Sequence, residues 1–182
     1  MGKRWLTAIF VVVAVHASGA SANGAERPVL DNGRNQFTFL EPRKPAPLTR
    51  ILAEDGSRFD LSRFSGRYVL LNFWATWCLP CVRELPSLQR LQFALGGQGF
   101  RVVALSVDDT DIAVPGEFMR QHGLQDLGVY LDVTDAATDT FPLYGLPITY
   151  LIDRKGAVIG YITGAVEWDS PAAIAFLRHY ID

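Results

Sequence analysis

The sequence has few of the residues that cross-link a fold or bind metals. Its 182 residues include only two cysteines and three histidines, and both cysteines lie in the motif Cys78-Leu79-Pro80-Cys81. Structural zinc sites usually have four cysteine or histidine ligands, so this composition disfavours such a site. A disulfide across so short a loop also constrains the unfolded chain little. Stability must therefore come from a hydrophobic core, which a chain of this length can bury.

Long blocks of one charge and long apolar runs are also absent. Lys and Arg number 17 and Asp and Glu 19, a net charge of −2, which does not suggest nucleic-acid binding. The apolar run Leu6–Ala17 is shorter than the roughly 20 residues that a membrane span needs. Basic residues precede it and Ala-Ser-Ala follows at 20–22. We therefore predict a signal peptide over residues 1–22, with retention as a membrane anchor as the alternative.

Residues 23–47 are rich in proline and poor in apolar residues. This composition predicts a linker or a loosely packed arm before the folded domain. The alternation of Phe37 and Phe39 leaves a second interpretation, in which the arm docks as a short edge strand. We assign residues 48–182 to one folded domain.

The stretch from Val69 to Pro86 organises that domain. Val69–Trp74 is a short apolar run, typical of a strand that is buried on both faces. A helix pattern follows the cysteine motif. Its apolar positions are Val82, Leu85, Leu88 and Leu91. The two cysteines are therefore expected where a central strand meets the N-terminus of a helix.

That position gives the cysteines unequal chemistry. The helix N-terminus carries unpaired N–H groups and about half a positive charge, so a thiolate at Cys78 would be stabilised and its pKa lowered. Pro80 suits the first helical turn. Cys81 should face the apolar interior, where a thiol ionises less readily. An exposed attacking thiolate and a buried resolving thiol make up a disulfide-exchange pair. Half of a metal site and an inert disulfide are the alternatives.

The other segments predict an α/β fold. Residues 48–64 read as a hairpin around Glu54-Asp55-Gly56-Ser57. Further strands are expected at 100–107, 127–133, 147–152 and 157–162, with helices at 116–122 and from Ser170-Pro171 onward. Helical crossovers imply parallel pairing of the central strands, to which the last two strands add an antiparallel hairpin.

Three separated stretches, in order, resemble one protein family. They are DGSRFDLSRFSGRYVLLNFW, NFWATWCLPCVRELP and GLPITYLID. Over residues 47–182 they resemble the TlpA/ResA-like branch of the thioredoxin superfamily, whose members are exported or membrane-tethered thiol:disulfide oxidoreductases. The resemblance implies a thioredoxin-like fold, with a central mixed sheet flanked by helices, an N-terminal β-hairpin extension and a C-terminal helix. It also implies a redox-active Cys78–Cys81 disulfide and no other cofactor.

The same resemblance assigns roles to individual residues. It makes Cys78 the attacking thiol, Cys81 the resolving thiol and Glu84 a carboxylate that exchanges protons with Cys81. Glu84 lies one helical turn after Cys81, and burial near a thiol would raise its pKa; an exposed helix glutamate is the alternative. Pro147 matches a proline whose preceding peptide bond is cis, which would bring the backbone of Leu146 close to the sulfur atoms.

A rim of residues around the disulfide is expected to contact clients. We place Trp77, Leu79, Pro80, Leu146 and Ile148 in it. Ile148 departs from the family pattern, because relatives often carry Thr or Glu there and the CcmG-type relatives carry Glu. This weakens a CcmG assignment and predicts a more apolar rim.

The two histidines of the expected domain, His122 and His179, are candidate metal ligands. Copper-binding SCO-like relatives pair a distal histidine with cysteines, but three residues separate their cysteines instead of two. His122 precedes Gly123 near a predicted helix end, where a cation is favourable. We therefore expect surface or capping roles for both histidines and no metal site.

The function expected from this resemblance is the reduction of disulfides in exported, thiol-containing client proteins, in cytochrome c or oxidase biogenesis. A membrane thiol-reductant transporter would supply the electrons. A disulfide-forming oxidant of the same fold and a copper-binding chaperone are the alternatives, while a peroxidase would need a cysteine motif that residues 73–78 do not provide. The location is periplasmic or otherwise exported, with membrane contact only if the N-terminal segment is retained.

Overall fold

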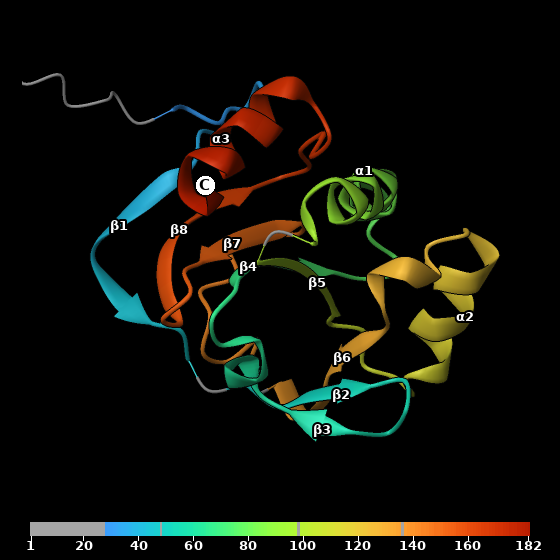
Figure 1. Ribbon diagram of the computed structural model, residues 1–182. Helices are drawn as coiled ribbons and strands as arrows, with labels where there is room; N and C mark the ends of the chain where they lie inside the picture. Colours follow the sequence, from blue (N-terminus) through green and yellow to red (C-terminus); the bar gives the residue numbers. More distant parts are fainter. Residues whose placement is uncertain (1–27, 48, 98, 136) are drawn as a thin grey trace, which may run out of the picture.

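The computed structural model describes residues 28–47, 49–97, 99–135 and 137–182. The predicted signal peptide and the first residues of the arm lie outside them. In the described part, three α-helices accompany one sheet of eight strands (Figure 1). The helices are α1 (Leu79–Leu95), α2 (Ala113–Gln121) and α3 (Pro171–Ile181). The strands are β1 (Thr38–Pro45), β2 (Ile51–Ala53), β3 (Arg58–Phe59), β4 (Tyr68–Trp74), β5 (Phe100–Ser106), β6 (Tyr130–Asp132), β7 (Ile148–Ile152) and β8 (Ala157–Thr163).

The sheet is mixed, with the order β1-β8-β7-β4-β5-β6-β2-β3. Strand β4 runs parallel to β5, and β5 parallel to β6, because α1 and α2 cross over between them. Strand β7 is antiparallel to both β4 and β8. This arrangement confirms the predicted thioredoxin-like α/β fold with its crossovers, its terminal hairpin and its C-terminal helix.

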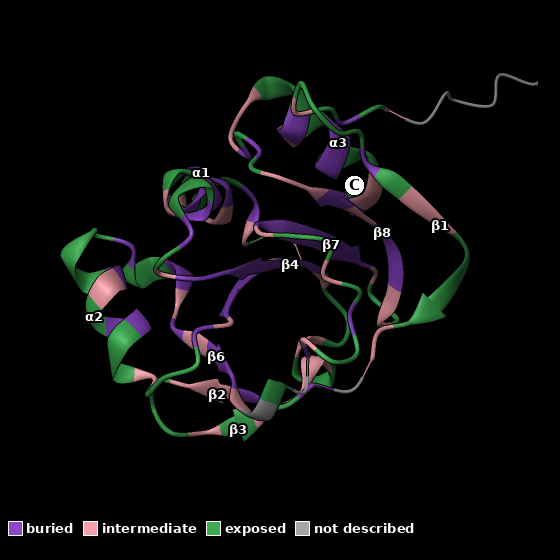
Figure 2. Cartoon of the chain, turned by 180° about the vertical axis from the view of Figure 1, so that it is seen from behind, coloured by how far each residue is buried: buried purple, intermediate pink, exposed green. Residues whose placement is uncertain are grey.

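Strand β4 lies at the centre of the core, and both of its faces are buried (Figure 2). Leu70 and Trp74 belong to a cluster that includes buried residues of α1 and α3. Phe73 and its neighbours on the other face pack with Phe141 and Tyr150. A strand covered on both sides needs apolar residues at nearly every position, which explains the continuous run that predicted it.

The arm is part of the domain, so the linker interpretation does not hold for residues 28–47. Strand β1 pairs antiparallel with β8, and Leu30 and Phe37 are buried. The Phe37 ring lies 4.8 Å from that of Phe176 in α3 and 5.1 Å from that of Phe39. A few apolar side chains thus cover α3 despite the prolines around them. The alternative prediction of an edge strand is confirmed.

Two boundaries differ from the sequence predictions. Helix α2 begins at Ala113, three residues before Gly116, because Pro115 falls in its first turn, where no N–H is needed. Strand β6 covers only Tyr130–Asp132, since residues 125–127 form a 3₁₀ turn. Neither difference moves the cysteine motif. No helix in the described ranges has the length and apolar character needed to cross a membrane.

Candidate active site

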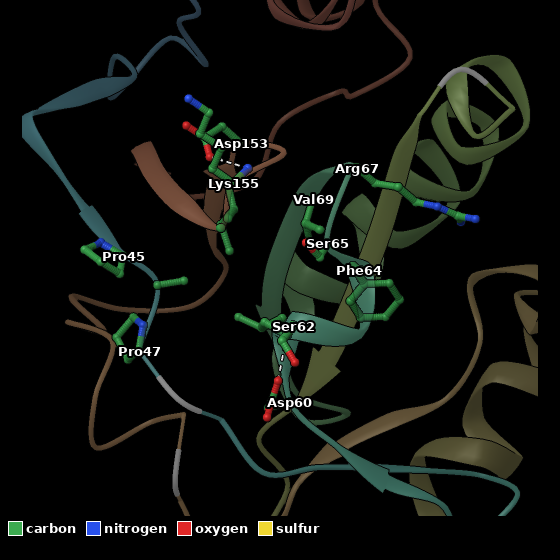
Figure 3. Close-up of a pocket in the computed structure, with 14 residues that line it drawn as sticks. Pro45, Pro47, Asp60, Ser62, Phe64, Ser65, Arg67, Val69, Asp153 and Lys155 are labelled. Carbon is green, nitrogen blue, oxygen red and sulfur yellow. Dashed lines mark hydrogen bonds between the residues drawn. The ribbon is translucent and has the colours of Figure 1, made fainter.

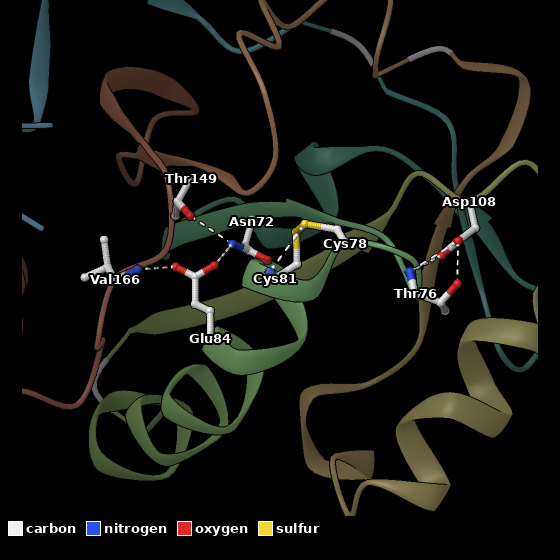
Figure 4. The surroundings of a disulfide bond; sticks show 8 residues. All are labelled: Asn72, Thr76, Cys78, Cys81, Glu84, Asp108, Thr149 and Val166. Carbon is white, nitrogen blue, oxygen red and sulfur yellow. Dashed lines mark hydrogen bonds between the residues drawn. A yellow bond between two sulfur atoms is a disulfide. The ribbon is translucent and has the colours of Figure 1, made fainter. Parts of the chain in front are cut away.

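The cysteine pair forms a disulfide where β4 meets α1 (Figure 4). Cys78 is the N-cap residue of α1, and its Sγ accepts a hydrogen bond from the backbone N–H of Cys81 at 3.3 Å. Pro80 occupies the first turn, as predicted. The Cα atoms of the two cysteines are 5.3 Å apart. The first sulfur atom therefore lies at the positive end of a 17-residue helix.

Cys78 is less accessible than the sequence analysis predicted. Its exposed fraction is 6%, against 0% for Cys81. The order of exposure is as expected, but both residues are buried because Cys78 belongs to the core cluster and Leu146 packs against that cluster. The exposed positions are the neighbours Trp77, at 71%, and Leu79. Only a small part of Cys78 is therefore open to solvent, and exposed apolar side chains precede and follow it in the chain.

The Leu146–Pro147 peptide bond is cis, as the family resemblance implied. Pro147 and Leu146 line the same groove as Pro80, two residues after Cys78. The cis turn is therefore beside the redox motif. A second cis bond, Glu41–Pro42, was not predicted.

Ile148 does not belong to the rim, so its assignment as a client-contacting residue is wrong. It is the first residue of β7, pairs in register with Phe73 and Thr163, and is completely buried. Its side chain packs in the core cluster on the face of β4 that carries Phe73. The backbone has entered the sheet directly after the cis turn, so the residue after Pro147 cannot reach a client. The apolar rim is provided by Trp77 and Leu79 instead.

Glu84 is buried one turn after Cys81 and is not an exposed helix glutamate. Its Oε1 accepts hydrogen bonds from the backbone N–H of Val166 at 2.9 Å and from Nε1 of Trp168 at 2.6 Å. Its Oε2 accepts from Nδ2 of Asn72 at 3.0 Å. Burial raises the pKa of Glu84 to about 7, although these hydrogen bonds act in the opposite direction. The carboxyl group can therefore change protonation state near neutral pH.

Asn72 joins Glu84 to the sheet, a role that the sequence analysis missed. Its Nδ2 also donates to Oγ1 of Thr149 on β7, at 2.9 Å. Its Oδ1 is buried and has no hydrogen-bond partner among the described residues. The sequence did contain one indication of this role, because Asn72 is a polar residue within the apolar run Val69–Trp74. Such a residue in a buried strand needs partners, and here one of them is Glu84.

A second buried carboxylate fixes the loop before the disulfide. Asp108 accepts hydrogen bonds from the backbone N–H of Thr76 at 3.0 Å and from its hydroxyl at 2.7 Å. The hydroxyl of Ser106, at the end of β5, also donates to Asp108 at 2.7 Å. Figure 4 shows this group on the opposite side of the disulfide from Glu84. The backbone leading into Cys78 is therefore anchored to the neighbouring strand. The sequence analysis did not identify this role of Asp108.

His122 and His179 are far from the disulfide motif in the sequence, and each contacts a residue close to it in the chain. Nδ1 of His122 is 2.8 Å from the carbonyl oxygen of Phe118, and the two rings stack 4.0 Å apart. His179 lies in the last turn of α3 with its ring against Tyr180. In the described ranges, no three His, Cys, Asp or Glu residues are grouped so that they could hold a metal ion.

Another hollow, of about 230 Å³, lies at the opposite end of β4 (Figure 3). Its lining includes Val69, near the start of β4, and Ile152, at the end of β7. Pro45, Pro47 and Phe64 give it an apolar wall. None of its lining residues is a cysteine or a histidine. The redox chemistry therefore belongs to the disulfide and not to this hollow.

Comparisons with known proteins agree with this geometry. The AhpC/TSA family model matches residues 42–161. Thiol-disulfide oxidoreductase ResA of Bacillus thuringiensis subsp. konkukian is 37% identical over 125 residues, which are 69% of this chain and 71% of the relative. ResA of Bacillus subtilis is 37% identical over 112 residues, 62% of each chain. The crystal structure of a protein assigned as thiol:disulfide interchange protein DsbE from Chlorobium tepidum covers 79% of this chain and 99% of its own, with 26% identity and a TM-score of 0.69.

Proposed function

This chain belongs to the AhpC/TSA family and is a thioredoxin-like thiol:disulfide oxidoreductase, similar to ResA, and we propose that it reduces disulfides of exported partner proteins through Cys78 and Cys81. The observation that carries the proposal is the hydrogen bond from the N–H of Cys81 to Sγ of Cys78 at the tip of α1. After reduction, the same N–H and the helix end would stabilise a thiolate at Cys78.

The reaction begins with the reduced pair. The Cys78 thiolate attacks one sulfur atom of the client disulfide, a mixed disulfide forms, and the client's other sulfur leaves as a thiolate that takes up a proton. Cys81 then loses its proton and attacks Sγ of Cys78. The second client thiolate leaves, and the Cys78–Cys81 disulfide that the structure contains is the product. Two electrons have passed from the cysteine pair to the client.

Glu84 provides a proton acceptor for the second step. Cys81 is buried, so its proton needs an acceptor within the protein. Glu84 lies one turn further along the same helix face, and its pKa of about 7 lets it take up a proton near neutral pH and release it later. Trp168 and Val166 hold the carboxyl group in place throughout.

We extend the proposal to location and partners. The signal-like residues 1–22 support export, and a reductant in an oxidising compartment needs a continuing supply of electrons. A membrane thiol-reductant transporter would supply them by reducing the Cys78–Cys81 disulfide. We include clients in cytochrome c or oxidase biogenesis, which the resemblance to the TlpA/ResA-like branch implies.

The proposal is tested by trapping and by the reduction potential. A Cys81→Ser variant should accumulate a mixed disulfide with a disulfide-bonded client, whereas Cys78→Ser should form none and should lose turnover. Equilibration of the wild type with glutathione should give a potential nearer to the roughly −270 mV of thioredoxin than to the roughly −120 mV of DsbA. A DsbA-like potential would overturn the reducing direction in favour of an oxidant. Full turnover by the Cys81 variant would remove its resolving role.

A further inference from the structure

A groove of about 370 Å³ opens beside the disulfide motif, and four separate parts of the chain form its walls. The arm contributes Asn32 and Arg34, the first turns of α1 contribute Pro80 and Arg83, and the cis turn contributes Leu146 and Pro147. Two small residues after β8 complete it. None of the described residues that line it is an aspartate or a glutamate. The groove therefore combines the apolar side chains of Pro80, Leu146 and Pro147 with two cationic side chains.

Arg34 and Arg83 are both exposed, and within the described residues no hydrogen bond or ion pair engages either guanidinium group. Elsewhere the pattern differs. Arg90 binds Asp169 and Glu167, and Arg120 binds carboxylates as well. A guanidinium group without a partner retains its full capacity to hold a carboxylate with two hydrogen bonds.

The acidic residues nearest to this pair in the sequence do not line the groove. Asp31 precedes Arg34 by three positions, but its Oδ1 accepts the N–H of Gly33 and it does not line the groove. Glu84 follows Arg83 directly, yet its side chain is buried among Asn72, Val166 and Trp168. The residues that line the groove therefore carry positive charge only.

The backbone that carries Arg34 is tied to the sheet. Oδ1 of Asn32 accepts the N–H groups of Arg34 at 3.1 Å and of Asn35 at 2.8 Å. The side-chain amides of Asn32 and Asn35 both donate to the carbonyl oxygen of Thr163, the last residue of β8, at 3.0 Å. The turn is thus held beside the groove before any ligand arrives, which lowers the entropic cost of binding.

We propose that this groove binds an extended client segment that carries aspartate or glutamate beside its disulfide, with Arg34 and Arg83 pairing with the carboxylates. This inference rests on the proposed reductase function and names the class of client. The exposed side chains of Trp77 and Leu79, on either side of Cys78, provide contacts for apolar client residues. Electrostatic complementarity of this kind selects partners and speeds their encounter.

The test uses two disulfide-bonded peptides of equal length, one with glutamates next to its cysteines and one with glutamines at the same positions. At low ionic strength, the reduced wild-type enzyme should reduce the glutamate peptide with a kcat/KM roughly five- to tenfold higher, as expected for two exposed ion pairs. High salt should shrink that ratio. In the double variant Arg34→Gln, Arg83→Gln the ratio should fall to about one.

Arg58 provides the matched control, because it is exposed, lies on β3 at the far edge of the sheet and has no ion-pair partner in the described part of the chain. Arg58→Gln should keep the wild-type preference, and a preference lost equally in this variant would overturn the inference. Equal reduction of both peptides by the wild type would overturn the groove inference alone. Failure to reduce either peptide would overturn the reductase proposal and the inference together.

Discussion

At the scale of single residues, Glu84 and Asn72 form one protonation-dependent unit. An ionised carboxylate only accepts hydrogen bonds, so it keeps the amide nitrogen of Asn72 turned toward Glu84. Oδ1 of Asn72 is then left without a partner. A protonated Glu84 could donate its hydroxyl to that oxygen once the amide rotates by half a turn. The network can therefore accommodate both states of the carboxyl group, as a proton acceptor requires.

The first prediction concerns Glu84→Gln. The glutamine oxygen can still accept from Val166 and Trp168, and its amide can donate to a rotated Asn72, so the fold should persist. Release of the client from the mixed disulfide should slow by roughly a hundredfold, since general-base assistance is lost. Wild-type release should rise with pH through an inflection near 7, which follows the ionisation of Glu84, and the variant should lack it.

Stopped-flow measurement of client release between pH 5 and pH 9 checks this prediction. Glu117→Gln is the control, because Glu117 is exposed on α2 and pairs with Arg120 at the surface. Alkylation of Cys78 should differ little between Glu84→Gln and the wild type. An unaltered inflection in Glu84→Gln would show that another group accepts the proton.

The functional residues that could be predicted from the sequence share one property. They lie close together in the chain, so their types and spacing form a recognisable motif. Cys78, Cys81 and Glu84 lie within two turns of one helix, so a linear pattern contains them. Asn72 and Asp108 act through partners far away in the chain, Thr149 on β7 and Thr76 in the loop after β4, and a local pattern does not contain those contacts. Ile148 was misplaced for the converse reason, because proximity in sequence to Pro147 was taken as proximity to the client.

At the scale of elements, periodicity identified the buried strands and the long helix, but in the arm it supported only the alternative interpretation of an edge strand. Strand β4 is covered on both faces and α1 on one, so their sequences carry clear patterns. The arm has only scattered apolar residues among prolines, and its main aromatic contact, with Phe176, lies far away in the chain. Docking of this kind depends on contacts between residues far apart in the chain, which the sequence of a short segment does not reveal.

The second prediction follows from that docking. Phe37→Ala should lower the free energy of unfolding by roughly 3 kcal/mol, because it removes a buried ring packed on Phe39 and Phe176. Urea denaturation measures the change, and hydrogen exchange of the β1 amides should speed up. Phe93→Ala on α1 is the control: its ring is 67% exposed, so the change should stay within about 0.5 kcal/mol. Equal effects of the two substitutions would mean that the arm adds no stability.

At the scale of the whole molecule, the third prediction links stability to pH. The pKa of Glu84 is about 7 in the folded protein, against 4.5 for an unperturbed glutamate. As pH rises, the unfolded chain therefore loses this proton before the folded protein does. The contribution of Glu84 to the free energy of unfolding is complete below pH 4.5 and is lost as pH rises through 7. One group with this shift changes the free energy of unfolding by roughly 3 kcal/mol.

Urea denaturation of the oxidised wild type and of Glu84→Gln at pH values from 4.5 to 8 isolates this contribution. The other carboxylates with shifted pKa values, such as Asp60 and Glu117, are shifted downward and are common to both proteins. The wild type should lose stability relative to the variant as pH rises. A constant difference across the range would contradict the prediction.

The two edge strands of the sheet determine how readily this protein can pair with strands of other chains. Strand β1 contains Pro42 and Pro45, which have no N–H, and Arg43 and Lys44, and its register with β8 shifts after Phe39. The opposite margin, β3, is only two residues long. Such margins are poor templates for adding a foreign strand. A thiol:disulfide oxidoreductase that contacts thiol-containing protein substrates can then bind them at its active-site face, without pairing with them along the margins of its sheet.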